Sequence, residues 1–277
     1  MSFSKLDDNL DERSIFLRRK LLKIVDHCRR GHIGSSLSLL EILRVLYDDI
    51  LRYNPQQSDW PDRDRFILSK GHGCLSLYML LAEKGFFKED ELTRVCQYEA
   101  LLGGHPEYGC IPGVEASTGA LGHGVSMGVG MALAAKIDKK SYKVFVLVGD
   151  GECQEGTIWE AAMSASKHKL SNFTVIVDYN HMQAYGPIDD VQCIEPLSDK
   201  WKSFGFTVHQ CDGHNVNQLR TILSGKSFSI STPNVVICDT IKGKGIPSIQ
   251  GNPDWHHKSK VTDEEITGLY KELEGQK

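Results

Sequence analysis

The sequence has no long hydrophobic run and no marked excess of charge of one sign. Of its 277 residues, 40% are hydrophobic and 25% are charged, with 32 Lys and Arg against 36 Asp and Glu. No apolar stretch approaches the ~20 residues of a membrane-spanning helix, and residues 1–19 carry charges throughout without a secretory cleavage pattern. No stretch is basic enough to neutralise nucleic-acid phosphates. We therefore expect a cytoplasmic protein that binds neither membranes nor nucleic acid.

The sequence also has few cysteines and no linker-like segment. Eight Cys in 277 residues are too few for a disulfide scaffold, and none form the paired CxxC motifs of a zinc site. We expect free thiols. No Pro/Gly/Ser-rich segment or charge run divides the chain, so the sequence favours a single domain over residues 1–277.

Short buried strands alternating with helices make up most of the chain. Helical periodicity predicts helices over residues 14–28, 37–51, 75–83, 157–168 and 262–273, with a glycine-containing loop over 30–36. Strands are predicted over residues 65–69, 143–148, 173–177, 206–211 and 235–239. Apolar strands without alternation, separated by helices, indicate an α/β fold: a parallel sheet with helices on both faces.

Polar residues follow several of these strands directly. Ligands bind at the carboxyl ends of strands in such sheets, which draws attention to His72, Asp150 with Gly151, Asn180 and the loop after Asp239. A Gly-Asp-Gly turn alone is weak evidence. Adjacent parallel strands would, however, bring Asp150 and Asn180 together, and a carboxylate, an amide oxygen and a loop carbonyl suit Mg²⁺ once diphosphate oxygens and a water complete the octahedron. The helix that starts after Gly156 would turn its positive end toward the same anion.

At these residues the sequence resembles a known family. The segment from Gly149-Asp150-Gly151 to Asn180 is similar to the thiamine diphosphate motif, and the surrounding sequence resembles transketolase. The resemblance covers almost the whole chain, in the family's order, through these blocks: Gly31–Gly34, Ser69–His72, Gly104–Glu107, Thr118–Gly124, Lys242–Gly245 and Trp255-His256.

The resemblance implies a role for each matching position. Asp150, Asn180 and the backbone carbonyl of Met182 would hold the metal. This metal would be Mg²⁺, with Ca²⁺ or Mn²⁺ as a substitute. Thiamine diphosphate would be contacted through its diphosphate by Gly151, His72 and His256, with Asn180 alongside, and through its rings by Gly119, Ala120 and Leu121. The reacting carbon and the sugar hydroxyls would face His32, His72, His105 and His256, and imidazole suits proton transfer at neutral pH.

Some positions stay open or depart from the pattern. His257 competes with His256 for the same role, and we prefer His256 because it directly follows Trp255. Glu155 and Glu160 either favour the start of a helix or lie at a subunit interface, as their family counterparts do. Ile33 and His123 differ from the common family residues at positions without a proposed ligand role. We assign no role to His27, His168, His209 and His214.

The resemblance stops short of a whole enzyme. Transketolase continues into a pyrimidine-binding domain, which supplies the glutamate that activates the cofactor, and then into a third domain; nothing in this sequence corresponds to either. We therefore expect the diphosphate-binding subunit of a split transketolase, inactive alone and assembled as two copies with two of a companion chain. It would transfer a two-carbon ketol unit from a ketose (phosphate) to an aldose (phosphate). The alternatives are an alpha-type subunit of a thiamine enzyme that decarboxylates 2-oxo acids and a non-catalytic module of the same fold.

Overall fold

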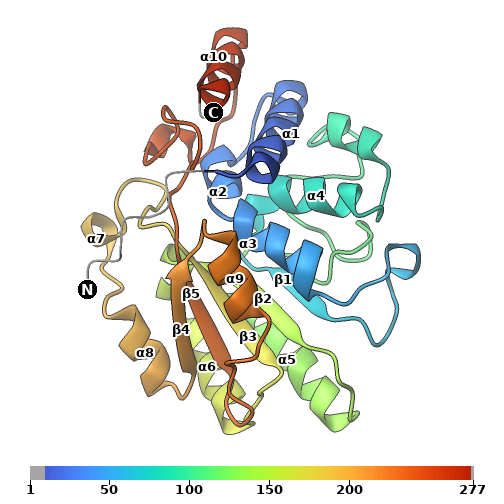
Figure 1. The fold of residues 1–277 in the computed structure, drawn as a ribbon, viewed down its shortest axis with the longest axis vertical. Coiled ribbons are helices and arrows are strands. Elements are labelled where there is room, and N and C mark those ends of the chain that lie inside the picture. Colours follow the sequence, from blue (N-terminus) through green and yellow to red (C-terminus); the bar gives the residue numbers. More distant parts are fainter. Residues whose placement is uncertain (1–9, 276–277) are drawn as a thin grey trace.

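A five-stranded sheet forms the centre of the molecule in the computed structural model, which describes residues 10–275 (Figure 1). The strand order is β1-β2-β3-β5-β4, and every neighbouring pair is parallel. The strands are β1 (Arg65–Leu68), β2 (Val144–Gly149), β3 (Phe173–Tyr179), β4 (Thr207–Asp212) and β5 (Asn234–Asp239). The sheet predicted from the sequence is confirmed.

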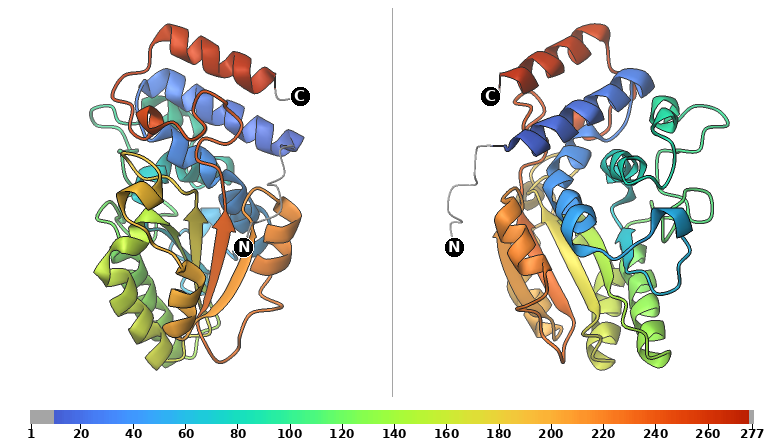
Figure 2. Two further views of the ribbon diagram at one scale, coloured as in Figure 1. Left: turned by 90° about the vertical axis from the view of Figure 1, so that its left-hand side faces the viewer. Right: turned by 45° about the vertical axis from the view of Figure 1, so that its right-hand side comes forward.

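Helices cover both faces of this sheet, because successive strand side chains point to opposite faces. In β2, Phe145 and Leu147 enter one apolar core, whereas Val144, Val146 and Val148 enter the other. The first core is built with α1 (Glu12–Cys28), α3 (Leu40–Val45), α4 (Cys74–Glu83), α9 (Val216–Leu223) and α10 (Asp263–Glu274). The second is built with α5 (His123–Ile137), α6 (Gly156–Lys167) and α8 (Leu197–Ser203). Figure 2 shows α10 lying along α1 at one end of the molecule.

The segment after α1 differs from the sequence-based expectation. Residues 30–36 were expected to form a loop, but α2 (Ile33–Ser38) begins directly after His32 and is followed by α3 and a π-helical turn, Leu46–Ile50. Every residue of α2 is buried. A helix enclosed on all sides has no polar face and so lacks the amphipathic periodicity that marks a surface helix.

Helix α5 was absent from the sequence-based interpretation. Its sequence, HGVSMGVGMALAAKI, consists largely of Gly, Ala and other small or apolar residues and shows no clear polar stripe. Gly128 packs so closely on the sheet that a Cβ there would lie 2.5 Å from a methyl of Val146. The helix therefore depends on close packing against β2, a signal that periodicity does not carry.

The carboxyl ends of the strands gather the loops that matter for function. The helix predicted over 157–168 is α6, and it connects β2 to β3, so that Gly149 is paired with Asp178 in neighbouring strands. β4 lies at the sheet edge and its side chains are mostly half-buried, unlike those of β2, β3 and β5. A short helix, α7 (Ile188–Val191), follows the loop after β3. Among the helices of residues 10–275, none combines the length and apolarity needed to cross a bilayer.

Candidate functional site

A cavity of about 320 Å³ opens at the carboxyl edge of the sheet. Its walls come from the segments that follow β1, β2, β3 and β5, together with the start of α2 and the loops around residues 105, 119 and 256. Among the residues that line it are His32, Lys70, His72, His105, Gly119, Leu121, Asp150, Gly151, Glu152, Asn180, Met182, Gln183, Lys242 and His256. A cavity therefore lies where the sequence predicts a ligand site, and most of the predicted site residues line it.

Asp150 forms the floor of the cavity beside the end of β2. Its carboxylate accepts hydrogen bonds from the backbone N–H groups of Gly151 (2.8 Å) and His181 (2.6 Å). Burial, and then the negative charge of Asp178, raise the pKa of Asp150 to about 6. A buried carboxylate with a raised pKa gains from a cation placed next to it.

Asn180 is oriented by its neighbour at the end of β3. Its amide Nδ2 donates to Asp178 (3.3 Å), and its Oδ1 accepts from the backbone N–H of Met182 (3.1 Å). Asp178 in turn accepts hydrogen bonds from Lys70 (2.5 Å), Ser38 (2.6 Å) and Thr240 (2.5 Å). Burial alone would raise the pKa of Asp178, but the charge of Lys70 and these hydrogen bonds lower it. Asp178 and Lys70 therefore form a buried framework that fixes the Asn180 loop.

The four histidines predicted from separate loops come together in space. The ring centroid of His32 lies 5.2 Å from that of His72, 6.1 Å from that of His105 and 5.4 Å from that of His256, and His72 lies 5.5 Å from His256. His257 is also close, 4.7 Å from His32, but its side chain is exposed and it does not line the cavity. Four imidazoles on one side of a cavity can bind and exchange protons with several hydroxyls of one substrate.

Burial and the surrounding positive charges favour the neutral form of these rings. Burial is the largest cause for each ring: it lowers the pKa of His32 to about 4 and that of His256 to about 3, with nearby Lys242 contributing in both cases. The pKa of His72 lies well below its ordinary value for the same reasons, with Lys70 the next cause, and that of His105 is also lowered. A neutral imidazole can accept and donate a hydrogen bond at once, which a charged ring cannot.

Lys242 connects the histidine cluster to the Asn180 loop. Its ammonium group donates to His256 Nδ1 at 2.7 Å, to the backbone carbonyl of Gln183 at 3.0 Å and to that of Met182 at 3.4 Å. Burial and the neighbouring charge of Lys70 lower the pKa of Lys242 to about 8. The Met182 carbonyl proposed as a metal ligand therefore already contacts a cationic side chain.

The glycine loop predicted to line the cofactor rings is only partly in place. Gly119 and Leu121 line the cavity, whereas the exposed Ala120 does not. Gly119 has φ +152°, a backbone conformation that strains any residue with a side chain, and a Cβ there would reach van der Waals contact with the His105 ring at 3.4 Å. The loop therefore needs glycine at this position for its backbone conformation.

The two glutamates left open at the start of α6 lie in different surroundings. Glu155 precedes α6 and lines the cavity, while Glu160 is exposed on the helix. Glu155 makes no side-chain hydrogen bond to the helix start. Its proposed role at a subunit interface stays a prediction.

Sequence reasoning missed several residues of the site. Lys70 and Lys242 lie inside motifs that resemble the family, and Asp178 lies two residues before Asn180. None of the three received a role, because the sequence does not show that their charges are buried. Glu152 was also missed: it is buried and accepts hydrogen bonds from Ser69 (2.5 Å), Gly122 N–H (2.8 Å) and Gly149 N–H (3.1 Å). It ties the Gly122 turn to the end of β2. The only signal that could have found it is its position in the Gly149–Glu152 turn.

The donor set suits a metal that is completed by its ligand. Within residues 10–275, no group of three or more His, Cys, Asp and Glu side chains is arranged to hold a metal ion. One buried carboxylate, one amide oxygen and one carbonyl are hard oxygen donors, and they leave positions for diphosphate oxygens and water. The residues present therefore fit a magnesium–diphosphate pair rather than a metal bound by the protein alone.

Comparison with known proteins identifies the family. Residues 12–276 match the family described as transketolase, thiamine diphosphate binding domain. The chain is 42% identical over 258 residues to a subunit of apulose-4-phosphate transketolase from Actinobacillus succinogenes, covering 93% of each chain. It is 36% identical over 274 residues to 6-deoxy-6-sulfo-D-fructose transketolase subunit SqwG of a Clostridium species, covering 99% of this chain and 98% of the relative.

Solved structures agree with this assignment. Transketolase from Leishmania mexicana matches with a TM-score of 0.87 and 30% identity over 94% of this chain. Transketolase from Campylobacter jejuni matches with a TM-score of 0.87 and 31% identity over 95%. The chain spans 40% and 42% of the length of these two proteins. The resemblance inferred from the sequence motifs is confirmed, and the chain belongs to the transketolase thiamine diphosphate binding domain family.

Proposed function

We propose that this chain is the diphosphate-binding subunit of a two-chain transketolase that uses thiamine diphosphate and Mg²⁺. The observation that carries the proposal is a single cavity in which the Asp150–Asn180 pair, suited to a metal diphosphate, lies beside four clustered histidines. The relatives named as subunits of apulose-4-phosphate and 6-deoxy-6-sulfo-D-fructose transketolases support it, since this chain matches them over nearly their whole length.

Each group of residues would have its own task. Asp150, Asn180 and the Met182 carbonyl would hold the metal, with Ca²⁺ or Mn²⁺ as substitutes, and the backbone at Gly151 would lie against the diphosphate. When bound, thiamine diphosphate supplies the carbanion that attacks the ketose carbonyl and takes up its two-carbon unit. Lys242, close to the Met182 carbonyl, would add positive charge beside the diphosphate.

The histidines would serve the sugar. His32, His105 and His256 would bind and orient hydroxyl groups. Their lowered pKa keeps the rings neutral near pH 7, so each ring can accept a hydrogen bond from one hydroxyl and donate one to another. His72 would contact both the diphosphate and the reacting region, because it lies in the Gly71–Gly73 turn shortly after β1 and its ring centroid is 5.2 Å from that of His32.

The substrate class follows from the relatives' names. One acts on a sugar that carries a phosphate and another on a sugar that carries a sulfo group. We propose that this chain serves a ketose with an anionic group remote from the carbonyl. The residues that read this group would belong mainly to the companion chain. A role in the decarboxylation of 2-oxo acids is disfavoured, because such a substrate offers no row of hydroxyls to four histidines.

Assembly with a companion chain tests the proposal. The companion would carry the pyrimidine-binding domain, two copies of each chain would form the particle, and the enzyme would act in the cytoplasm. We expect this chain alone to give no ketol transfer at any cofactor concentration, and the addition of the companion to restore transfer from a panel of phosphorylated and sulfonated ketoses. Full activity of the single chain, shown free of a second polypeptide by mass spectrometry, would contradict the split-enzyme proposal.

A further inference from the structure

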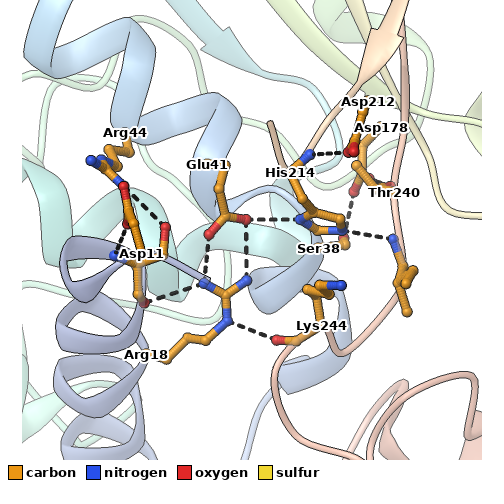
Figure 3. A network of polar contacts seen from close by, with 12 residues as sticks. Asp11, Arg18, Ser38, Glu41, Arg44, Asp178, Asp212, His214, Thr240 and Lys244 are labelled. Carbon is orange, nitrogen blue, oxygen red and sulfur yellow. Dashed lines mark hydrogen bonds and ion pairs between the residues drawn. The ribbon is translucent and has the colours of Figure 1, made fainter. Parts of the chain in front are cut away.

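A fully buried polar network lies outside the cavity, between α1, α3 and the loop after β4 (Figure 3). At its centre, Glu41 forms an ion pair with Arg18, with Oε1–Nη1 at 2.5 Å and Oε2–Nη2 at 3.1 Å. The Glu41 carboxylate also accepts from His214 Nδ1 at 2.9 Å. The side chains of Arg18, Glu41 and His214 are each at most 1% exposed. Glu41 therefore joins two buried side chains that do not bind each other, and its carboxylate holds both in fixed geometry.

Both ends of this network bind the backbone of the segment that follows β5. His214 Nε2 accepts a hydrogen bond from the N–H of Ile241 (2.8 Å), while Arg18 Nε donates to the carbonyl of Lys244 (2.7 Å). The ring must therefore carry its proton on Nδ1, facing Glu41, and keep Nε2 free as an acceptor. The backbone of residues 241–244, with Lys242 between the two anchored positions, is thus held by two side chains that do not line the cavity.

The position of His214 is itself fixed by its surroundings. Its backbone N–H donates to Asp212 (2.8 Å), and Gly213 N–H donates to the carbonyl of Asp239 (2.7 Å). The loop after β4 is thereby joined to the end of β5. A displacement of the His214 ring would transmit directly to Ile241.

Lys242 is the residue of this segment that enters the site. It reaches His256 and the carbonyls of Met182 and Gln183 only if residues 241–244 keep this course. The side chain of Thr240 is held separately by Asp178. Backbone hydrogen bonds from Gly243 to Gly34 (3.1 Å) and from Gly251 to Lys242 (3.1 Å) also hold the segment, and the network of Glu41 adds the anchors at Ile241 and Lys244.

We propose that His214, supported by Glu41 and Arg18, is a positioning residue of the cofactor site that acts through Lys242. The inference rests on the proposed function, because it assumes that Lys242 faces a bound diphosphate. The His214 ring binds Glu41 and the backbone of Ile241, which lie outside the lining of the cavity, and so sets the backbone from which Lys242 extends.

Two substitutions separate the two hydrogen bonds of the ring. His214→Gln can place an oxygen near the position of Nε2 and so keep the acceptor for Ile241, whereas His214→Asn can keep only the donor to Glu41. In the assembled two-chain enzyme, calorimetry with thiamine diphosphate and Mg²⁺ should show about threefold to thirtyfold weaker cofactor binding for His214→Asn. His214→Gln should stay within about twofold of the unmodified enzyme.

A control and a double variant distinguish positioning from general destabilisation. Asp64→Asn disturbs another buried carboxylate, which binds Arg52 at the opposite edge of the sheet, and should lower thermal stability without changing cofactor affinity. In a Lys242→Met background, the effect of His214→Asn should largely disappear, because the residue through which it acts is gone.

The outcomes differ for the two hypotheses. Absence of thiamine diphosphate binding by the unmodified assembly would contradict the proposed function itself. The positioning role would be overturned if both His214 variants bound the cofactor as tightly as the unmodified enzyme, or if both lost the same affinity. It would also be overturned if His214→Asn weakened binding just as much in the Lys242→Met background. If His214→Asn does not assemble, hydrogen exchange of the unmodified enzyme provides the test. The Ile241 amide should exchange as slowly as the amides of β5, and fast exchange at Ile241 would overturn the inference.

Discussion

Asp150 follows β2, and Asp178 lies near the end of the neighbouring strand β3. Both are buried, but different groups stabilise their negative charges. Asp178 is paired with Lys70 and accepts from Ser38 and Thr240, and its pKa is lowered. Asp150 accepts from backbone N–H groups, and its pKa is raised to about 6. Asp178 is therefore a carboxylate that stabilises the fold, whereas Asp150 is a carboxylate suited to a ligand. A buried charge without a protein partner lowers the free energy of unfolding until a cation binds next to it.

The largest expected effect comes from breaking the balanced pair. Asp178→Asn leaves the ammonium of Lys70 buried without its carboxylate, and loss of one partner of a buried pair costs about 3–5 kcal/mol. Urea denaturation of the chain at pH 7 should show this loss in the free energy of unfolding. A loss below about 1 kcal/mol would mean that Lys70 has another way to be neutralised.

The second prediction tests the opposite carboxylate. Asp150→Asn loses a hydrogen bond but relieves repulsion with Asp178, so the free energy of unfolding without cofactor should change by only about 1 kcal/mol. The same variant should bind thiamine diphosphate with Mg²⁺ at least about a hundredfold more weakly, since it removes the one charged ligand. Unchanged affinity by calorimetry on the assembled enzyme would refute the metal-site assignment.

The histidines extend the comparison to the sugar side of the cavity. His72→Ala should weaken cofactor binding and slow ketol transfer, whereas His105→Ala should lower kcat about tenfold or more and leave cofactor affinity nearly intact. The reason is that His72 is partly buried and feels the charge of Lys70, while His105 is exposed. Steady-state kinetics beside calorimetry provides both quantities, and wild-type kinetics in both variants would show that the roles are wrong.

The smallest expected effect is on how steeply the free energy of unfolding depends on pH. Burial alone would raise the pKa of Glu41, but the charge of Arg18 and the hydrogen bond from His214 lower it. A lowered pKa in the folded state gives stability that is present above the ordinary value of 4.5 and is lost as pH falls below it. Glu41→Gln should therefore flatten the fall in unfolding free energy between about pH 5 and 3.

The control for Glu41→Gln is Glu264→Gln, which removes an exposed carboxylate of α10. This control should leave the pH dependence of the free energy of unfolding unchanged. Equal slopes in the unmodified chain and in Glu41→Gln would mean that Glu41 does not retain its charge to low pH in the folded chain.

The sequence by itself determined the sheet and the loops that bear the site. Apolar strands without alternation can only be buried on both faces, and glycine-flanked polar residues at their ends place Asp150, Asn180 and His72 at one edge. His256, which we preferred to His257, lines the cavity, and its contact with a diphosphate stays a prediction. These features are local in sequence, or follow from the rule that parallel strands share an edge.

Only the tertiary structure decided which charges are balanced. Lys70 and Asp178 are 108 residues apart, and Glu41 and His214 are 173 apart, so no spacing in the sequence links them. Helices α2 and α5 were misread or missed for a related reason: their stability comes from enclosure by other elements, not from a periodic polar face. A residue's charge state depends on its burial and on partners brought by the fold, and this is why His214, without a motif of its own, received no role until its neighbours were known.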